Sequence, residues 1–251
     1  MPRLFGIFAD SPVRLADAVI HGAEVDEVPT AARWGCAYTQ EGKALIKEQP
    51  LRPGMTLSGA LADTTSRAAV VRCWTEGDGA PRRFGSWLWG WEGELAVGAE
   101  DLREAAAGLP ESLQINLRPV TPDNLLFHRV LAALQGLRVK LGFWGPPVEP
   151  VVDAIQQALV TWRAHFGRID GRFVLATERR AFAAALGAPL GVGSWRPSPD
   201  GLEAVDEEEA TVWTLADAGG PHAQPLEAGT VLTLSSEARP RRYDLTHGAW
   251  R

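Results

Sequence analysis

The segment that decides the fold is Trp87-Leu88-Trp89-Gly90-Trp91-Glu92-Gly93-Glu94-Leu95. Its three tryptophans alternate with other residues, and side chains two positions apart on a strand point to the same face of a sheet. A strand with such a face has two interpretations. It forms part of a sheet-on-helix core, or it is an aromatic binding surface, because Trp is enriched at interfaces. The small residues Gly85, Gly90 and Gly93 suit close packing of large rings, and they favour the core.

The rest of the chain follows the order strands, helices, strands. Apolar and alternating runs predict strands at 3–9, 34–39, 43–48, 67–74, 86–91, 173–177, 181–186, 210–215 and 230–235. Helical spacing and helix-end signals predict helices at 101–107, 122–136 and 150–166. Ser11-Pro12 is expected to end the first strand, and 77–83 is expected to be a loop. The order predicts a single α+β domain over residues 1–251, with two helices packed between or over antiparallel sheets.

Composition narrows the class of protein. The net charge of -6 disfavours a nucleic-acid binder, which normally carries a basic face. No apolar run has the length of a membrane span, and no signal peptide is evident, so a cytoplasmic protein without membrane contact is expected. The two cysteines, Cys36 and Cys73, provide neither a disulfide framework nor zinc-ligand spacing. We expect no metal and no cofactor.

Five stretches carry a family resemblance in a shared order. They are Met1-Pro2-Arg3-Leu4-Phe5-Gly6, Trp34-Gly35-Cys36-Ala37-Tyr38, Val70-Val71-Arg72-Cys73-Trp74-Thr75, the segment from Trp87 to Leu95, and Thr121-Pro122-Asp123-Asn124-Leu125-Leu126-Phe127. Together they resemble the motifs of the class II glutamine amidotransferases and cover roughly the first half of the chain. The resemblance implies the four-layer αββα sandwich of the N-terminal-nucleophile hydrolases.

The resemblance also locates the positions of the family's catalytic groups. In that family an N-terminal Cys, exposed by removal of the initiator Met, attacks the amide of glutamine. Here Pro2 stands at the nucleophile position, and its amine cannot form the family's acyl-enzyme by the family route. The family's oxyanion-binding Asn corresponds to Glu92, whose carboxylate offers no hydrogen-bond donor. Gly93, whose backbone N–H assists the oxyanion in the family, is kept.

The ligand-binding positions are partly kept. Arg72 matches the family Arg that pairs with the α-carboxylate of glutamine, and Thr75 is also retained. A structural Arg72, satisfied by carbonyl oxygens or by Glu92, is an equal alternative. The family Asp that holds the α-amino group falls on Pro122, with Asp123 next to it as a partial replacement or a helix-start residue. Trp91 takes the place of the family His and is also a predicted ligand-binding residue.

These changes favour a catalytically degenerate amidotransferase-like protein, a pseudoenzyme that acts by binding. The predicted partner is another protein, with this chain as scaffold, regulatory or silent subunit, or an amino-acid-like small ligand; a homodimer would be unsurprising. The alternative is an active amidohydrolase of altered mechanism that uses the Pro2 amine and Glu92. A third hypothesis, an active hydrolase with a differently aligned site, requires a nucleophile that the sequence does not reveal.

Overall fold

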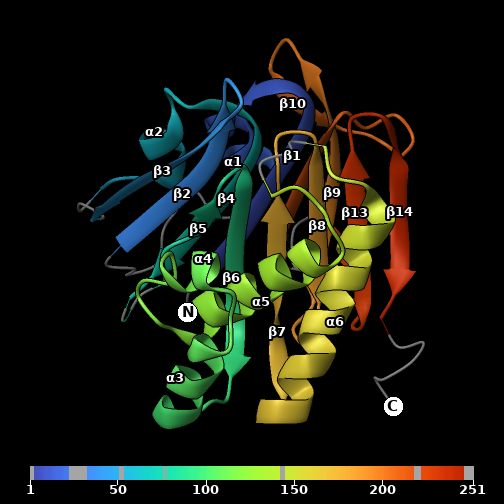
Figure 1. The fold of residues 1–251 in the computed structure, drawn as a ribbon. Coiled ribbons are helices and arrows are strands. Elements are labelled where there is room, and N and C mark those ends of the chain that lie inside the picture. The colour runs from blue at the N-terminus through green and yellow to red at the C-terminus, as the bar shows by residue number, and fades with distance from the viewer. Residues whose placement is uncertain are drawn as a thin grey trace.

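The computed structural model describes residues 3–22, 33–50, 54–75, 77, 79–141, 145–217 and 222–245. In this part of the chain two antiparallel sheets are stacked, with helices on the outer side of each (Figure 1). Three separate apolar clusters fill the spaces between the four layers. The predicted αββα sandwich is therefore confirmed. Pro2 lies outside the described residues.

The first sheet has β1 near its centre, between β11 and β4. Its order is β10 (Gly201–Ala204), β9 (Leu190–Ser198), β11 (Val212–Asp217), β1 (Arg3–Arg14), β4 (Thr65–Trp74), β2 (Arg33–Gln40) and β3 (Lys43–Pro50), and β12 (Gln224–Leu226) also pairs with β9. The second sheet contains the tryptophan segment. Its order is β14 (Ala238–Asp244), β13 (Thr230–Ser235), β8 (Arg180–Ala185), β7 (Ile169–Ala176), β6 (Trp87–Leu95) and β5 (Arg82–Phe84).

Helices cover the outer faces of both sheets. Helices α1 (Leu15–Gly22) and α2 (Leu57–Leu61) supply apolar residues to a cluster with the first sheet. Helices α5 (Pro122–Gly136) and α6 (Val148–Phe166) form the main cluster with the second sheet. Helices α3 (Ala99–Ala107) and α4 (Glu111–Gln114) lie beside α5 (Figure 1). The predicted helix at 101–107 and the two long helices are thus present.

The tryptophan segment forms the strand expected of it, with its large rings on one face. Trp87, Trp89 and Trp91 are buried in the cluster between the second sheet and the helices. The ring of Trp89 stacks between Phe127 and Phe173, with centroid separations of 5.5 and 4.8 Å. The opposite face of β6 carries Leu88, which packs between the two sheets. The core interpretation is confirmed.

The first strand does not end at Ser11-Pro12 as predicted. Strand β1 continues to Arg14, but its register with β4 shifts between Phe8 and Val13. Pairing with β11 covers only Gly6 to Ala9. Pro12 therefore sits where the ladder is interrupted and no backbone N–H is required for pairing.

Several short elements were not predicted. They are α1, α2, α4, β9, β10, β12 and β14, and β5 begins inside the expected loop at 77–83. Most of these elements are short, and tertiary packing rather than local propensity decides whether such segments form.

Candidate functional site

Glu92 is held by an arginine from the neighbouring strand. It lies directly opposite Arg172 in the antiparallel pair of β6 and β7. Nε and Nη2 of Arg172 donate to Oε2 of Glu92 at 3.0 and 2.7 Å. The two side chains are only 14% and 9% exposed, and Nη1 of Arg172 also donates to the carbonyl oxygen of Pro189. Such charge-assisted bonds engage the carboxylate form of Glu92, which accepts hydrogen bonds and donates none.

Gly93, the next residue, has a backbone conformation and surroundings that leave no room for a side chain at this position. Its φ is +138°, a value that L-residues rarely adopt. A Cβ at this position would lie 2.2 Å from the carbonyl oxygen of Asp170 and 2.3 Å from Cα of Gly171 on β7. Gly93 is thus required by the close approach of two strands, whatever its role at an oxyanion site.

Arg72 extends from β4 into the space between the two sheets. It follows the alternation of Ala68 and Val70, which pack in that space, and its Cδ lies 3.8 Å from the position that a Cβ would take on Gly90. Arg72 is 6% exposed, and its Nε has no hydrogen-bond partner in the described part of the chain. Burial lowers the pKa of Arg72, and the charges of Asp123 and Glu92 partly oppose that effect.

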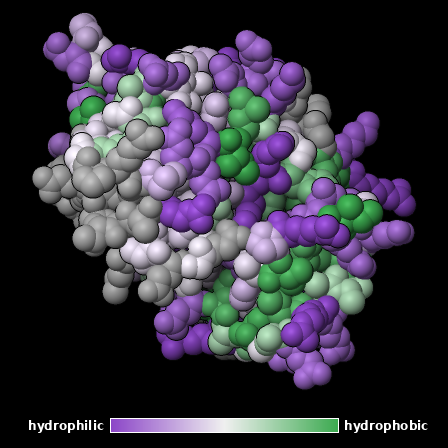
Figure 2. Space-filling model, turned by 90° about the vertical axis from the view of Figure 1, so that its left-hand side faces the viewer, coloured by the Kyte–Doolittle hydropathy of each residue, from purple (hydrophilic) through white to green (hydrophobic). Residues whose placement is uncertain are grey.

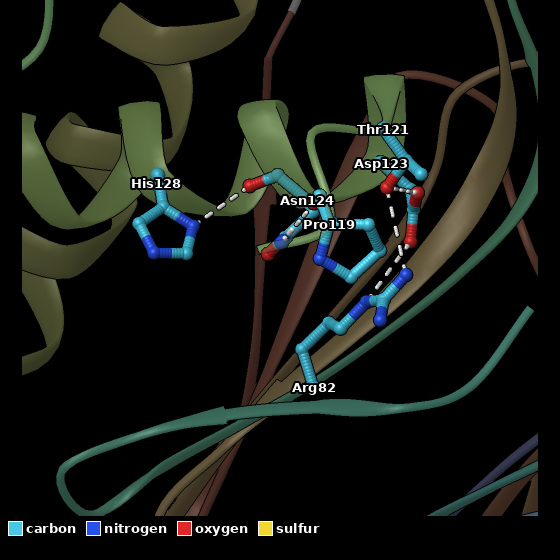
Figure 3. Close-up of polar contacts among 6 residues, drawn as sticks. All are labelled: Arg82, Pro119, Thr121, Asp123, Asn124 and His128. Atoms are coloured by element: carbon cyan, nitrogen blue, oxygen red, sulfur yellow. Dashed lines mark hydrogen bonds and ion pairs between the residues drawn. The ribbon is translucent and has the colours of Figure 1, made fainter. Parts of the chain in front are cut away.

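Asp123 lies in the first turn of α5 beside a second unpredicted arginine, Arg82 (Figure 3). Oδ1 of Asp123 accepts a hydrogen bond from the Thr121 hydroxyl at 2.6 Å, and its Oδ2 lies 3.7 Å from Nε of Arg82. Nη2 of Arg82 is 3.5 Å from the same hydroxyl. Thr121 occupies the predicted cap position, but its side chain makes no cap hydrogen bond. It is used to hold Asp123.

The structure brings together only some of the predicted site residues. Arg72 is within electrostatic range of both Glu92 and Asp123. Trp91 is buried among the helices, on the opposite face of β6 from Glu92, and its Nε1 donates to the carbonyl oxygen of Gly93 at 3.3 Å. Thr75 is exposed just beyond β4. Trp91 is therefore not placed beside Arg72, and Pro2 is outside the described residues.

Arg172 and Arg82 were missed by the sequence analysis. The available signal for Arg172 was a cation directly before the apolar run 173–176, because a charge next to a buried run requires a partner. The partner is 80 residues away in the sequence. Nothing in the sequence identified Arg82 as the neighbour of Asp123.

Neither cysteine offers a replacement nucleophile. Cys36 and Cys73 are buried in the cluster between the first sheet and its helices, and Cys73 points away from the Arg72 face as predicted. Burial raises the pKa of the Cys36 thiol, which disfavours the reactive thiolate. Among the described residues no cluster of His, Cys, Asp or Glu is suited to a metal ion. No helix in the same ranges has the length and apolar character needed to cross a membrane.

His128 is a buried histidine near this site rather than a surface residue. Its Nδ1 is 2.9 Å from the carbonyl oxygen of Asn124, whose side chain donates to the carbonyl of Pro119 (Figure 3). The ring contacts Phe84 and Phe127 edge-on, and Nε2 has no hydrogen-bond partner among the described residues. Burial lowers the pKa of His128. The hydrogen bond to Asn124 raises this pKa, and the positive charge of Arg82 lowers it further.

This histidine predicts a pH dependence of stability. The pKa of His128 is lower in the folded than in the unfolded state. Its contribution to the free energy of unfolding is therefore complete above about pH 6.5 and is lost as pH falls below that value. The effect reaches at most about 1.4 kcal/mol per pH unit. The variant His128→Gln should show a shallower loss of unfolding free energy between pH 7.5 and 5.5 in urea titrations.

His165 provides a matched control. It makes the same contact with a carbonyl one turn earlier, Nδ1 to Thr161 at 2.8 Å, but its ring is exposed on α6. The variant His165→Gln should retain the parental pH slope. An unchanged slope in His128→Gln would contradict the assignment.

Comparison with known proteins supports the fold. No protein-family model matches the sequence, and no curated protein matches it. Among solved structures, a glutamine aminotransferase class-II domain protein from Silicibacter pomeroyi is similar, with a TM-score of 0.64 and 14% identity over 97% of this chain and 99% of that chain. A predicted glutamine amidotransferase from Pseudomonas aeruginosa has a TM-score of 0.56 and 14% identity, over 94% and 98%.

A third similar structure is the glutamine phosphoribosylpyrophosphate amidotransferase of B. subtilis. Its TM-score is 0.59 at 15% identity, and this chain covers 50% of it while 98% of this chain is matched. At such low identities the likeness concerns the fold. The chain therefore has the two-sheet αββα fold of class II glutamine amidotransferase domains.

Proposed function

We propose that this protein is a catalytically degenerate glutamine amidotransferase-like protein that binds a carboxylate ligand without hydrolysing an amide. The observation that carries the proposal is the pairing of Glu92 with Arg172. Glu92 stands at the position that the family resemblance assigns to the oxyanion-binding Asn. A paired carboxylate there has no proton to donate to a developing oxyanion and repels its charge.

The magnitude of this change supports loss of the family chemistry. Removal of one oxyanion donor typically slows an enzyme by about two to three decades. A fixed negative charge in place of that donor adds repulsion. Pro2 in addition lacks the thiol that forms the acyl-enzyme. The alternative mechanism, in which Glu92 carries protons for the Pro2 amine, is disfavoured because the carboxylate is already bound by Arg172.

The environment of Arg72 supports the proposal that the ligand is a carboxylate. The buried guanidinium of Arg72 has an Nε without a hydrogen-bond partner among the described residues, which costs free energy unless a ligand supplies an acceptor. Asp123, the expected partner of an α-amino group, is already contacted by Thr121 and Arg82. We therefore propose an acid that resembles an amino acid but does not depend on an α-amino group.

The high tryptophan content is explained by the core and does not require a protein-binding surface. The tryptophans whose side chains the structure describes are all buried: Trp34, Trp74, Trp87, Trp89, Trp91, Trp162, Trp195 and Trp213. A small ligand at Arg72 is thus better supported than a partner protein held by aromatic residues.

Two measurements on the full-length protein test the proposal. Ammonia release from glutamine and from γ-glutamyl compounds should equal the background. Calorimetric titration with glutarate and with L-glutamate should show binding, and Arg72→Gln should weaken it by about tenfold or more, as expected for loss of a charged hydrogen bond.

Arg83→Gln is the matched control. Arg83 is an exposed arginine on β5, and the substitution removes the same charge as Arg72→Gln. It should bind both acids as the parent does. Ammonia release that disappears in Arg72→Gln would overturn the degenerate assignment. Equal binding by parent and Arg72→Gln would overturn the ligand assignment.

A further inference from the structure

A hollow of about 790 Å³ lies on the outer face of the helical layer, between α3, α5 and α6. The second sheet separates it from the space between the sheets that contains Arg72. Figure 2, which views the molecule from the left-hand side of Figure 1, shows apolar side chains gathered at the lower right, on the side where the helices lie. The volume of the hollow is within the range typical of small-molecule sites, about 300–1,000 Å³.

Arg129 of α5 lines this hollow, and no counter-ion pairs with it among the described residues. It is half-buried, and its Nε is inaccessible and has no hydrogen-bond partner in the described part of the chain. Its Cζ lies 5.6 Å from the ring centroid of Phe166. Burial lowers the pKa of Arg129, and no carboxylate opposes that effect. A cation in this setting is stabilised by an anion that supplies acceptors and restores its solvation.

The remaining lining defines the shape of that anion. Leu109, Ala132, Ala158 and Phe166 provide apolar surface next to Arg129. Asp101 and Glu104, both exposed on α3, lie at the same hollow and disfavour a ligand with several negative charges. One charged head on Arg129 and one apolar body along the helices satisfy both features.

We propose that the hollow between α3, α5 and α6 is a binding site for an amphipathic monocarboxylate, whose head pairs with Arg129. This site is separate from the carboxylate site proposed at Arg72. A ligand here contacts three helices at once, and occupancy should therefore raise the stability of the helical layer.

Octanoate is a suitable probe because it combines one carboxylate with an apolar chain. We expect calorimetric titration of the full-length protein to show octanoate binding. Arg129→Met keeps an apolar stem over Phe166 but removes the charge, and it should weaken octanoate binding about tenfold or more. Arg103→Gln removes an exposed charge from α3 and should bind as the parent does.

A second variant guards against misfolding of Arg129→Met. Gly136 lines the hollow, and a Cβ built on it meets nothing within 4 Å. Gly136→Glu should therefore fold normally, place a negative charge in the hollow and also lose octanoate binding. Absence of octanoate binding by the parent, or parental affinity in folded Gly136→Glu, would overturn the proposal.

Discussion

Replacement of Gly93 by alanine is expected to destabilise the protein by about 3 kcal/mol or more. The backbone at φ +138° is costly for an L-residue, about 1–3 kcal/mol. The new Cβ would also lie 2.2 Å from the carbonyl oxygen of Asp170, which is backbone and cannot rotate away. The strands β6 and β7 would have to separate at the point where Glu92 and Arg172 pair. Urea unfolding of the purified variant measures the loss.

Gly136→Ala is the matched control for this prediction. Gly136 lies in the last turn of α5, and its surroundings are open. Alanine has a higher helix propensity than glycine, so this variant should be equally or slightly more stable than the parent, by up to about 1 kcal/mol. Equal unfolding midpoints for the two variants would show that the close approach of β6 and β7 is not as tight as described.

Replacement of Arg172 by methionine is expected to cost about 3–5 kcal/mol, the usual effect of removing one partner from a buried ion pair. The pair is buried, with side chains 9% and 14% exposed, and Glu92 would lose both hydrogen bonds from the guanidinium. Methionine preserves much of the apolar stem, so the loss reports mainly on charge and hydrogen bonding.

The double variant Glu92→Gln/Arg172→Met isolates the interaction between the two residues. Without the negative charge, loss of the guanidinium should be less costly, so the double variant should be more stable than Arg172→Met alone. Arg196→Met is the surface control, because Arg196 and Glu203 are 50% and 47% exposed. Its unfolding midpoint should match the parent. Additive effects of the two changes at 92 and 172 would contradict a coupled pair.

The layered fold was largely predictable because alternation along a strand assigns each residue to a face. The alternation of Trp87, Trp89 and Trp91 predicted a sheet-on-helix core, and the structure places all three rings there. The continuation of β1 past Pro12 was not predictable, because it depends on the register with β4 and β11. Short helices such as α1 also depend on packing against a sheet.

The candidate site was predictable only in part. Arg72 and Asp123 were identified from motif order, and the structure places them within electrostatic range of each other. Trp91 belongs to the opposite face of its strand from Glu92, as the alternation of β6 requires. The sequence thus already separated these two neighbours, although both were predicted to belong to the site.

The sequence by itself determined the chemistry that is absent at two positions, since Pro2 has no thiol and the carboxylate of Glu92 has no donor. It also determined which residues alternate between the faces of each strand. Only the tertiary structure decided what binds Glu92, Asp123 and Arg129. Strand pairing brings Arg172 to Glu92 across 80 residues, and helix packing brings Arg129 to Phe166. Charges interact through space, so their partners are set by register and packing rather than by spacing along the chain.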